Sequence, residues 1–145
     1  MTDVDELARR VAETLMAREG TAPMWGLVLE DAREGCARVS MVVKPQMLNG
    51  HATIHGGMIF ALADTAFAYA CNSRNASSVA QQASVHFMSP ARQGETLIAE
   101  AREISSVGRS GSYMVDVRTS DGRAIASFHG LSRTVGGSVI EIEEK

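Results

Sequence analysis

The stretch that decides the fold is residues 48–72, which read LNGHATIHGGMIFALADTAFAYACN. Its second half, residues 57–72, is predicted to be a helix. Before the final asparagine, the only polar side-chain groups of this helix are those of Asp64, Thr65 and Tyr69. A helix that is apolar around its whole circumference is expected to be buried on all sides. The rest of the chain must therefore wrap around it.

Short extended runs separated by turn residues stand on both sides of this helix. They are Trp25 to Glu30, Cys36 to Val43, Ser78 to Met88, Glu95 to Ser105, Ser112 to Thr119 and Ala124 to Arg133. The links between the last four runs carry Pro, Gly or Asp-Gly, and their spacing is that of an antiparallel meander. The sequence predicts an α+β fold, a curved antiparallel sheet of about six strands wrapped around one long buried apolar helix.

The two ends of the chain are expected to differ. Apolar residues recur every fourth position from Leu7 to Leu15, which predicts an N-terminal helix with one apolar face that ends near Gly20. The tail from Gly136 to Lys145 is expected to be loosely held. No repeat, linker or low-complexity tract divides the sequence, so residues 1–145 are predicted to form a single domain.

The composition excludes several classes of protein. The chain has 17 acidic and 14 basic residues, a net charge of −3, and no run of Lys or Arg that would attract a nucleic acid. Its apolar stretches fall short of the ~20 residues needed to span a bilayer, and its first ten residues do not resemble a signal peptide. With two cysteines, a disulfide framework has little support. We expect a cytoplasmic protein with no nucleic-acid partner and no membrane partner.

Asp64 is the chemically unusual residue of the predicted helix. The residues three and four positions away are all apolar, so no cation on the same helix can pair with its carboxylate. Removing a carboxylate from water costs several kcal/mol unless hydrogen bonds or a charge compensate, or unless its pKa rises. Such a group is either a structural acid bonded to a neighbouring segment or a catalytic base or nucleophile that faces a cleft. Perturbed carboxylates cluster in functional sites, which favours the second interpretation.

His55, Gly56 and Gly57 stand where this helix begins. Free peptide N–H groups and the positive end of the helix dipole would suit a carbonyl oxygen that becomes an oxyanion during acyl transfer. Glycine also lets a substrate approach the backbone closely. The alternative is that the glycines only permit a tight turn from loop to helix.

The spacing along the helix predicts a site shared between two copies. Asp64 follows Gly57 by two turns, or ~10 Å along the axis, which is awkward for one carbonyl to reach within one chain. Two helices side by side around a two-fold axis would place the helix start of one copy against the carboxylate of the other. A second copy would also cover the outer face of the sheet or its edge strands.

The same stretch closely resembles the hotdog-fold acyl-CoA thioesterases, specifically the PaaI type associated with phenylacetate degradation. The spacing of Asn49, His55 to Gly57 and Asp64 is the active-site pattern of that family. Residues 90–101 and 128–137 are also similar to it. The resemblance therefore covers most of the chain and implies the hotdog fold.

The resemblance also implies roles for these residues. Asp64 would be the nucleophile or the general base that activates water, and the N–H of Gly56, assisted by Gly57, would polarise the thioester carbonyl. Asn49 and His55 would orient the reacting groups. In the family these groups meet across a homodimer interface, and two dimers commonly form a homotetramer.

Two departures leave the attacking group open. Some relatives carry a hydroxyl residue where this chain has Ala80, and others carry one where it has Ala68. Attack by water and formation of an anhydride intermediate therefore both remain possible.

Several further residues are candidates for binding substrate. Arg109, in a glycine-flanked turn, would bind phosphates of coenzyme A, or it is a solvated turn charge. Met58, Phe60 and Tyr69 would line an acyl pocket, or they only pack in the core.

The expected reaction is hydrolysis of a small aromatic acyl-CoA thioester to a free acid and CoA, with hydroxylated phenylacetyl-CoA suggested by the resemblance alone. The alternatives are a hotdog enoyl- or hydroxyacyl-CoA hydratase or dehydratase and a non-catalytic acyl-CoA-binding module. No metal and no cofactor is expected, since no Cys or carboxylate near His51 and His55 completes a zinc set.

Overall fold

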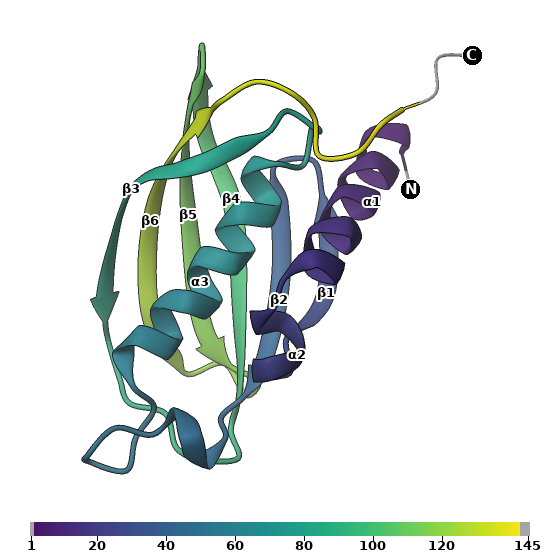
Figure 1. The fold of residues 1–145 in the computed structure, drawn as a ribbon. Helices are drawn as coiled ribbons and strands as arrows, with labels where there is room; N and C mark the ends of the chain where they lie inside the picture. Colours follow the sequence, from purple (N-terminus) through teal and green to yellow (C-terminus); the bar gives the residue numbers. More distant parts are fainter. Residues whose placement is uncertain (1, 143–145) are drawn as a thin grey trace.

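A six-stranded antiparallel sheet curves around a central helix in the computed structural model, which describes residues 2–142 (Figure 1). The strands are β1 (Val28–Arg33), β2 (Cys36–Val42), β3 (Ser78–Phe87), β4 (Thr96–Val107), β5 (Ser110–Thr119) and β6 (Ala124–Thr134). The helices are α1 (Asp3–Arg18), α2 (Thr21–Trp25), the 3-10 helix η1 (Pro45–Met47) and α3 (Gly56–Cys71). The predicted fold class, including the N-terminal helix, is confirmed. No helix within the described residues combines the length and the apolar character needed to cross a membrane.

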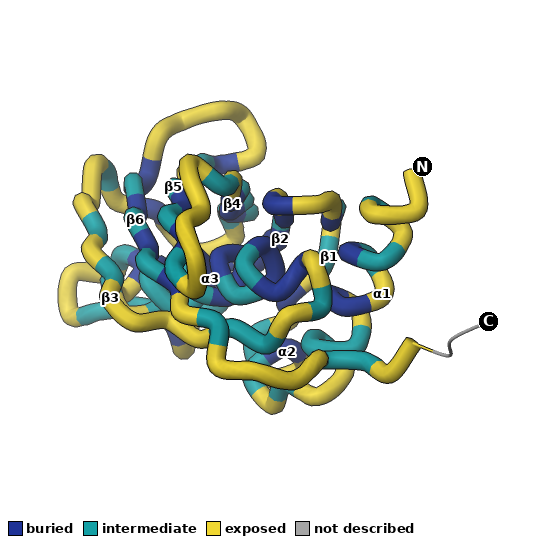
Figure 2. Tube along the Cα trace, turned by 90° about the horizontal axis from the view of Figure 1, so that it is seen from above, coloured by how far each residue is buried: buried dark blue, intermediate teal, exposed yellow. Residues whose placement is uncertain are grey.

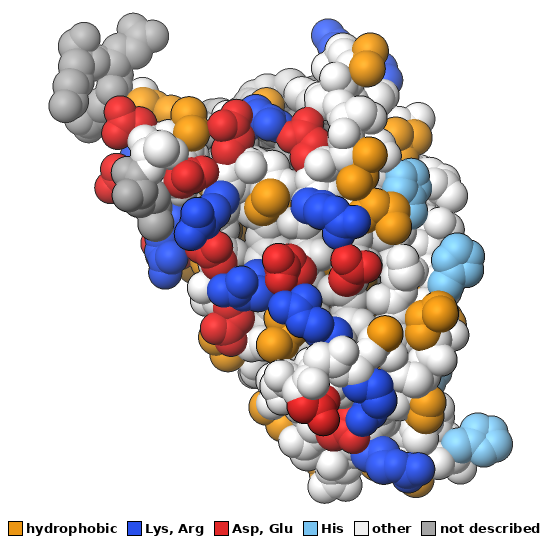
Figure 3. All heavy atoms as spheres, turned by 180° about the vertical axis from the view of Figure 1, so that it is seen from behind, with side chains coloured by type: hydrophobic (Ala, Val, Ile, Leu, Met, Phe, Trp, Pro, Cys, Tyr) orange, Lys and Arg blue, Asp and Glu red, His pale blue; other side chains and the backbone are white. Residues whose placement is uncertain are grey.

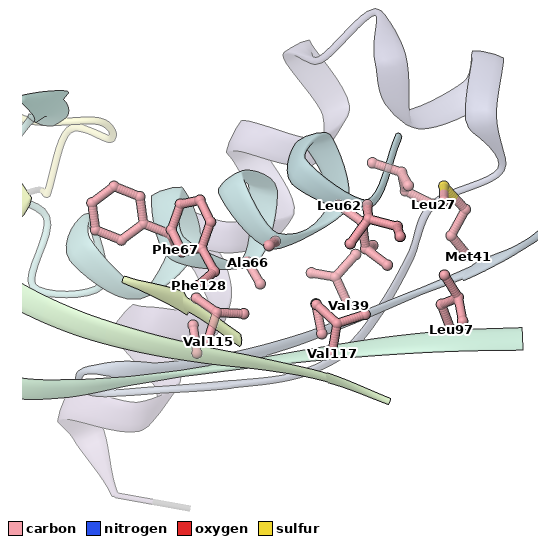
Figure 4. Close-up of a cluster of buried hydrophobic side chains, with 14 of the residues drawn as sticks. Leu27, Val39, Met41, Leu62, Ala66, Phe67, Leu97, Val115, Val117 and Phe128 are labelled. Carbon is pink, nitrogen blue, oxygen red and sulfur yellow. The ribbon is translucent and has the colours of Figure 1, made fainter. Parts of the chain in front are cut away.

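The core lies between α3 and the concave face of the sheet. Its side chains include Leu62, Ala66 and Phe67 of α3 and Val39, Val115, Val117 and Phe128 of the strands (Figure 4). The rings of Phe67 and Phe128 pack with their centroids 5.8 Å apart. Each fully buried side chain of this size contributes about 1.5–3 kcal/mol, so this contact fixes α3 on the sheet.

One face of α3 is only half-buried. Ala61, Asp64, Ala68 and Cys71 follow one another at intervals of three or four residues, and all four are partly accessible. The prediction that the helix is buried on all sides is therefore wrong for a single chain. The sheet covers one side of α3, and α1 covers only part of the other (Figure 2).

The order of the strands departs from a simple meander. The sheet runs β1-β2-β4-β5-β6-β3, so β3 pairs with β6 at one edge and not with β4, which follows it in sequence. The predicted meander is right for β4 to β6 and wrong for β3. The chain leaves α3 at the β6 edge, forms β3 there, and must then pass β6 and β5 to reach the place of β4. The turn residues Pro90 and Gly94 mark this change of direction, but they do not specify which strand pairs with which.

The first strand begins later than predicted. Trp25 was expected to open a strand, but it ends the short helix α2, and β1 begins at Val28. Pro23 fits the first turn of α2 because the N–H that it lacks would have no partner there. Gly26, at φ +66°, adopts the left-handed conformation that ends the helix.

The C-terminal tail is held as far as Ile140, which contradicts the expectation that it is loose from Gly136 onward. The side-chain oxygen of Asn75 accepts hydrogen bonds from the N–H groups of Val139 (3.0 Å) and Ile140 (2.9 Å). Its side-chain nitrogen donates to the carbonyl of Ile140 at 2.9 Å. The tail crosses one end of the molecule towards α1 (Figure 1). Residues 143–145 lie outside the described residues.

The outer face of the sheet is charged. Between β4 and β5, Arg102 pairs with Asp116 at 2.9 Å and Arg118 pairs with Glu100 at 3.1 Å. Figure 3 shows acidic and basic side chains interspersed over this face. A surface of this kind is stable in water without a cover. Of the two surfaces expected to meet another copy, the edge strands are therefore the better candidate.

Candidate active site

Asp64 lies halfway along α3 and faces a cavity of about 300 Å³. The walls of the cavity are the C-terminal end of α1, with Leu15 and Glu19, one face of α3, and the first residues of β3, 78–80. This wall is mostly apolar, as the composition of the helix predicts. A carboxylate in such a cavity is accessible to a small molecule but only partly hydrated.

The carboxylate of Asp64 is poised to accept a proton. Its burial raises its pKa above the ordinary value of 3.8, and the negative charge of Glu19 raises this pKa further. Within residues 2–142, no hydrogen bond or cation contributes to the shift. The interpretation as a structural acid bonded to a neighbouring segment therefore finds no partner in the described chain. An unpaired carboxylate of raised basicity has the properties of a general base.

The start of α3 leaves one peptide N–H free. His55 caps the helix, and its Nδ1 accepts the N–H of Gly57 at 2.8 Å. The N–H groups of Met58 and Ile59 reach the carbonyl oxygen of His55 at 2.9 and 3.3 Å. In the described chain, the N–H of Gly56 has no acceptor. Of the two glycines, the structure thus leaves Gly56 as the available donor, whereas the N–H of Gly57 is already used.

Gly56 lines a second cavity, of about 390 Å³. The other walls are the loop residues Asn49 and Ile54, Ile59 of α3, and residues 87–90 after β3. A Cβ at Gly56 would stand 3.0 Å from the ring of Phe87, so the absence of a side chain keeps this approach to the backbone open.

Asn49 shapes the loop beside this cavity. Its side-chain oxygen accepts the N–H groups of His51 at 2.8 Å and Thr53 at 3.3 Å, which is a local turn of the kind that asparagine favours. Its side-chain nitrogen donates to the hydroxyl of Thr53 at 3.2 Å. Asn49 therefore both fixes the loop before α3 and contributes to the wall of the cavity.

The two halves of the predicted site do not meet within one chain. Asp64 and Gly56 line different cavities, and the two cavities share no residue. Two turns of α3 separate them. The spacing in the sequence predicts that one carbonyl group does not easily reach both within one chain, and the two separate cavities agree with that prediction.

Tyr69 is the predicted acyl-pocket residue that lies beside Asp64. It lines the same cavity, and its hydroxyl donates a hydrogen bond to Glu19. Met58 and Phe60 line neither of the two cavities. Phe60 instead packs edge-on against Phe128, with ring centroids 5.4 Å apart.

Arg109 lines neither of these cavities and lies in the turn between β4 and β5. It lines a small cavity of about 100 Å³ together with Arg74, near the C-terminal end of α3. Arg74 is engaged by Glu34 at 2.8 Å and by Glu103 at 2.6 Å. The structure therefore places Arg109 at the end of α3 opposite Gly56.

Cys71 lines the Asp64 cavity but is not an activated nucleophile. Burial, with the charge of Asp64, raises the pKa of the Cys71 thiol to about 12, so the thiol stays protonated at neutral pH. Within residues 2–142, no three His, Cys, Asp or Glu side chains come together as a metal site.

Glu19 is the residue of the Asp64 cavity that sequence reasoning missed. It contacts Tyr69 across 50 residues of sequence, and nothing local points to that contact. One signal was present. Glu19 follows the last turn of α1, where a negative charge is unfavourable for the helix dipole.

Comparison with known proteins identifies similar chains. A family model described as the thioesterase superfamily matches residues 51–126. The chain is 38% identical over 128 residues to the acyl-coenzyme A thioesterase PaaI of Escherichia coli, covering 88% of this chain and 91% of that protein. It is 34% identical over 125 residues to a putative esterase of Archaeoglobus fulgidus, covering 86% and 81%. The solved structure of E. coli PaaI, from the phenylacetic acid degradation operon, matches with a TM-score of 0.92 at 36% identity, covering 94% of this chain and 99% of that chain.

Proposed function

The chain belongs to the thioesterase superfamily and is an acyl-CoA thioesterase similar to PaaI, and from this premise we propose that it hydrolyses small aromatic acyl-CoA thioesters. The products are a free acid and CoA. Its relationship to a protein of the phenylacetic acid degradation operon supports phenylacetyl or hydroxyphenylacetyl as the acyl group. The observation that carries the proposal is the unpaired carboxylate of Asp64 in a largely apolar cavity.

In the proposed reaction, Asp64 takes a proton from a water molecule as that water attacks the thioester carbonyl carbon. The carbonyl oxygen gains negative charge and accepts the N–H of Gly56 at the positive end of α3. When the tetrahedral intermediate collapses, the C–S bond breaks and the proton held by Asp64 passes to the departing thiolate. An alternative course, in which the carboxylate itself attacks and an anhydride is then hydrolysed, gives the same products.

His55 and Asn49 support this arrangement without contacting Asp64 in the same chain. By accepting the N–H of Gly57, His55 fixes the first turn of α3 and leaves the neighbouring N–H for substrate. Asn49 holds the loop that forms part of the wall of the cavity at Gly56.

We propose that two copies build each site. β3 lies at the edge of the sheet, and its Val79 and Phe87 are 52% and 55% exposed. A long edge strand with apolar side chains tends to pair with another chain. Pairing two β3 edges around a two-fold axis would extend the sheet and bring the half-buried faces of two α3 helices together. Gly56 of one copy would then face Asp64 of the other, and two such dimers would form the tetramer.

The remaining predictions are secondary to this site. Arg109 is proposed to bind a phosphate of CoA, where the CoA part of the substrate extends away from Asp64. Met58, Phe60 and Tyr69 are proposed to shape the cavity that holds the acyl group in the assembled dimer. The cytoplasmic location stays a prediction.

The substrate test is a panel of acetyl-, phenylacetyl-, hydroxyphenylacetyl- and palmitoyl-CoA, assayed for free thiol and for enoyl absorbance. We expect thiol release, fastest with the aromatic substrates. Thiol release from the aliphatic substrates alone would reject the aromatic class. A change in enoyl absorbance without thiol would instead identify a hydratase, and binding without either would identify a binding module.

Two substitutions at one position test the oxyanion donor. Gly56 is the first residue of α3, where proline is well tolerated, and His55 has the extended conformation that proline requires of its predecessor. Gly56→Pro therefore removes the N–H and keeps the helix, with an expected loss in kcat of about 10²–10³-fold. Gly56→Ala is the matched control, because it adds a Cβ beside Phe87 but keeps the N–H. Equal rates in the two variants would reject Gly56 as the donor.

Asp64→Asn tests the proposed base. The amide has nearly the same shape as the carboxylate but accepts no proton, so turnover is expected to fall at least ~10²-fold with the fold and the oligomer unchanged. Undiminished turnover in this variant would reject Asp64 as base and as nucleophile.

A further inference from the structure

The cavity of Asp64 contains a second carboxylate for which the proposed reaction has no use. Glu19 lies just beyond the last residue of α1 and forms part of the cavity wall. It is the only other charged group among the described residues that line this cavity. Two carboxylates in one apolar cavity repel each other, so their proximity requires a stabilising contact.

Tyr69 provides that contact. Its side chain is almost fully buried, at 1% exposure, and its hydroxyl donates to Oε2 of Glu19. Burial and the charge of Glu19 both raise the pKa of Tyr69 well above its ordinary value. The hydroxyl therefore keeps its proton and acts as a donor throughout the physiological pH range. A permanent donor holds the carboxylate of Glu19 in place in the wall of the cavity.

The surroundings of Asp64 leave Glu19 as its dominant electrostatic neighbour. From α1 it faces Glu19, and from its own helix it faces Tyr69 and Cys71, both of which stay neutral. The first residues of β3, 78–80, contribute Ser, Val and Ala, which carry no charge. No cation lines the described cavity to offset the negative charge of Glu19.

We propose that Glu19 is a positioning residue for the hydrolysis: the Tyr69 hydroxyl holds its carboxylate in the wall of the cavity that Asp64 faces, where its negative charge acts on Asp64. α1 then does more than cover part of α3, because its C-terminal end places the charge that adjusts the catalytic group. This inference rests on the proposed function of Asp64. A base whose pKa lies nearer the working pH transfers protons more efficiently, which gives the arrangement a catalytic purpose.

The direct test is Glu19→Gln. The glutamine amide oxygen can still accept the Tyr69 hydrogen bond, so the packing of α1 on α3 is kept while the charge is removed. We expect the acid limb of the kcat/KM profile to move to lower pH, and kcat on the plateau to fall while KM stays within about twofold. A residue with only a structural role would change the stability of the protein but would leave the position of the acid limb unchanged.

A second readout does not depend on turnover. The carboxyl carbon of Asp64 can be titrated by ¹³C NMR in the full-length protein, and the pKa of Asp64 is expected to be lower in Glu19→Gln than in the wild type. Glu13→Gln is the matched control: it removes a carboxylate from the exposed side of α1, where Glu13 pairs with Arg9 at 3.0 Å. This control is expected to leave both the profile and the titration unchanged.

The outcomes separate the proposed thioesterase function from the proposed role of Glu19. If the wild type releases no thiol from any substrate, the proposed function fails, and the NMR titration alone decides whether Glu19 acts on Asp64. If the wild type is active and Glu19→Gln shares both its pH profile and its Asp64 titration, the role of Glu19 is rejected. A shift of the profile that Glu13→Gln reproduces would also reject it, because any carboxylate of α1 would then suffice.

Discussion

Gly130 of β6 lies directly against the ring of Phe67 of α3. A Cβ built on Gly130 would stand 2.8 Å from two carbons of that ring, closer than non-bonded carbons approach in proteins. The ring also packs against Phe128 and Tyr113, with centroids 5.8 and 5.5 Å away. These two rings limit how far the Phe67 ring can move along the sheet. The central helix sits at its present height above the sheet because one strand residue has no side chain.

Gly130→Ala is expected to destabilise the protein by about 1–3 kcal/mol, the usual penalty for an added methyl group in a packed core. Urea unfolding at a fixed protein concentration measures the difference. Gly20→Ala serves as the control, since a Cβ there would meet nothing within 4 Å and the backbone is already helical. Equal stability of the two variants would show that α3 can move away from the sheet without loss.

Asp64→Asn should change the dependence of stability on pH in a defined direction. The pKa of Asp64 is raised above 3.8 in the folded protein, so the folded state binds this proton more tightly than the unfolded state. The stabilisation that results is complete below pH 3.8 and is lost as the pH rises through the folded pKa. The free energy of unfolding of the wild type, relative to that of Asp64→Asn, is therefore expected to fall as the pH rises from 3.8 through the folded pKa of Asp64. Unfolding curves of both proteins at a series of pH values measure it, and a constant difference would contradict the raised pKa.

A hybrid dimer tests whether the site is shared. In a dimer of one Asp64→Asn chain and one Gly56→Pro chain, a shared arrangement leaves one site with both defects and the other with none. Hybrids purified through two different tags are expected to regain about half of the wild-type activity, although each parent variant is nearly inactive. If one chain supplied both groups, every site of the hybrid would carry a defect and no activity would return.

His55→Ala removes the side-chain acceptor at the start of α3. The loss of this cap is expected to cost about 0.5–2 kcal/mol, because the N–H of Gly57 then has no partner in the helix. His55→Asn should recover most of that stability, since asparagine is a favourable cap. Thermal unfolding of the three proteins measures the effect. If alanine and asparagine proved equally stable, the hydrogen bond between Gly57 and His55 would have no role in holding the helix.

The central helix and its carboxylate were predictable because the signals are local. The 16 residues of α3 are apolar except for Asp64, Thr65 and Tyr69, and the isolation of Asp64 follows from its neighbours three and four positions away. His55 precedes the helix as its cap, and Gly56 is its first residue. The hotdog arrangement of one helix inside a curved sheet then follows from the need to bury that helix.

The pairing of β3 and the position of Glu19 were not predictable from such signals. The residues between β3 and β4 have the turn chemistry of a hairpin, yet β3 pairs with β6, because strand order depends on the path of the whole chain. Glu19 reaches Tyr69 only because α1 folds back over α3. The signals for α2 are local, in Pro23 and Gly26, but the apolar residues around Trp25 fit a strand as well. For β3 and for Glu19, the deciding contact lies outside the window in which periodicity is measured.

The amide of Asn75 has a practical consequence for anyone who shortens or extends this protein. The Asn75 side chain forms three hydrogen bonds with the backbone of Val139 and Ile140, accepting two and donating one, as the backbone of a neighbouring strand would. A chain cut back to Gly137 would keep the helices and strands described above but would lose these three hydrogen bonds. A fusion partner joined beyond Ile140 would keep them. Asn75, more than sixty positions upstream, therefore makes Ile140 the last residue that a shortened chain should keep.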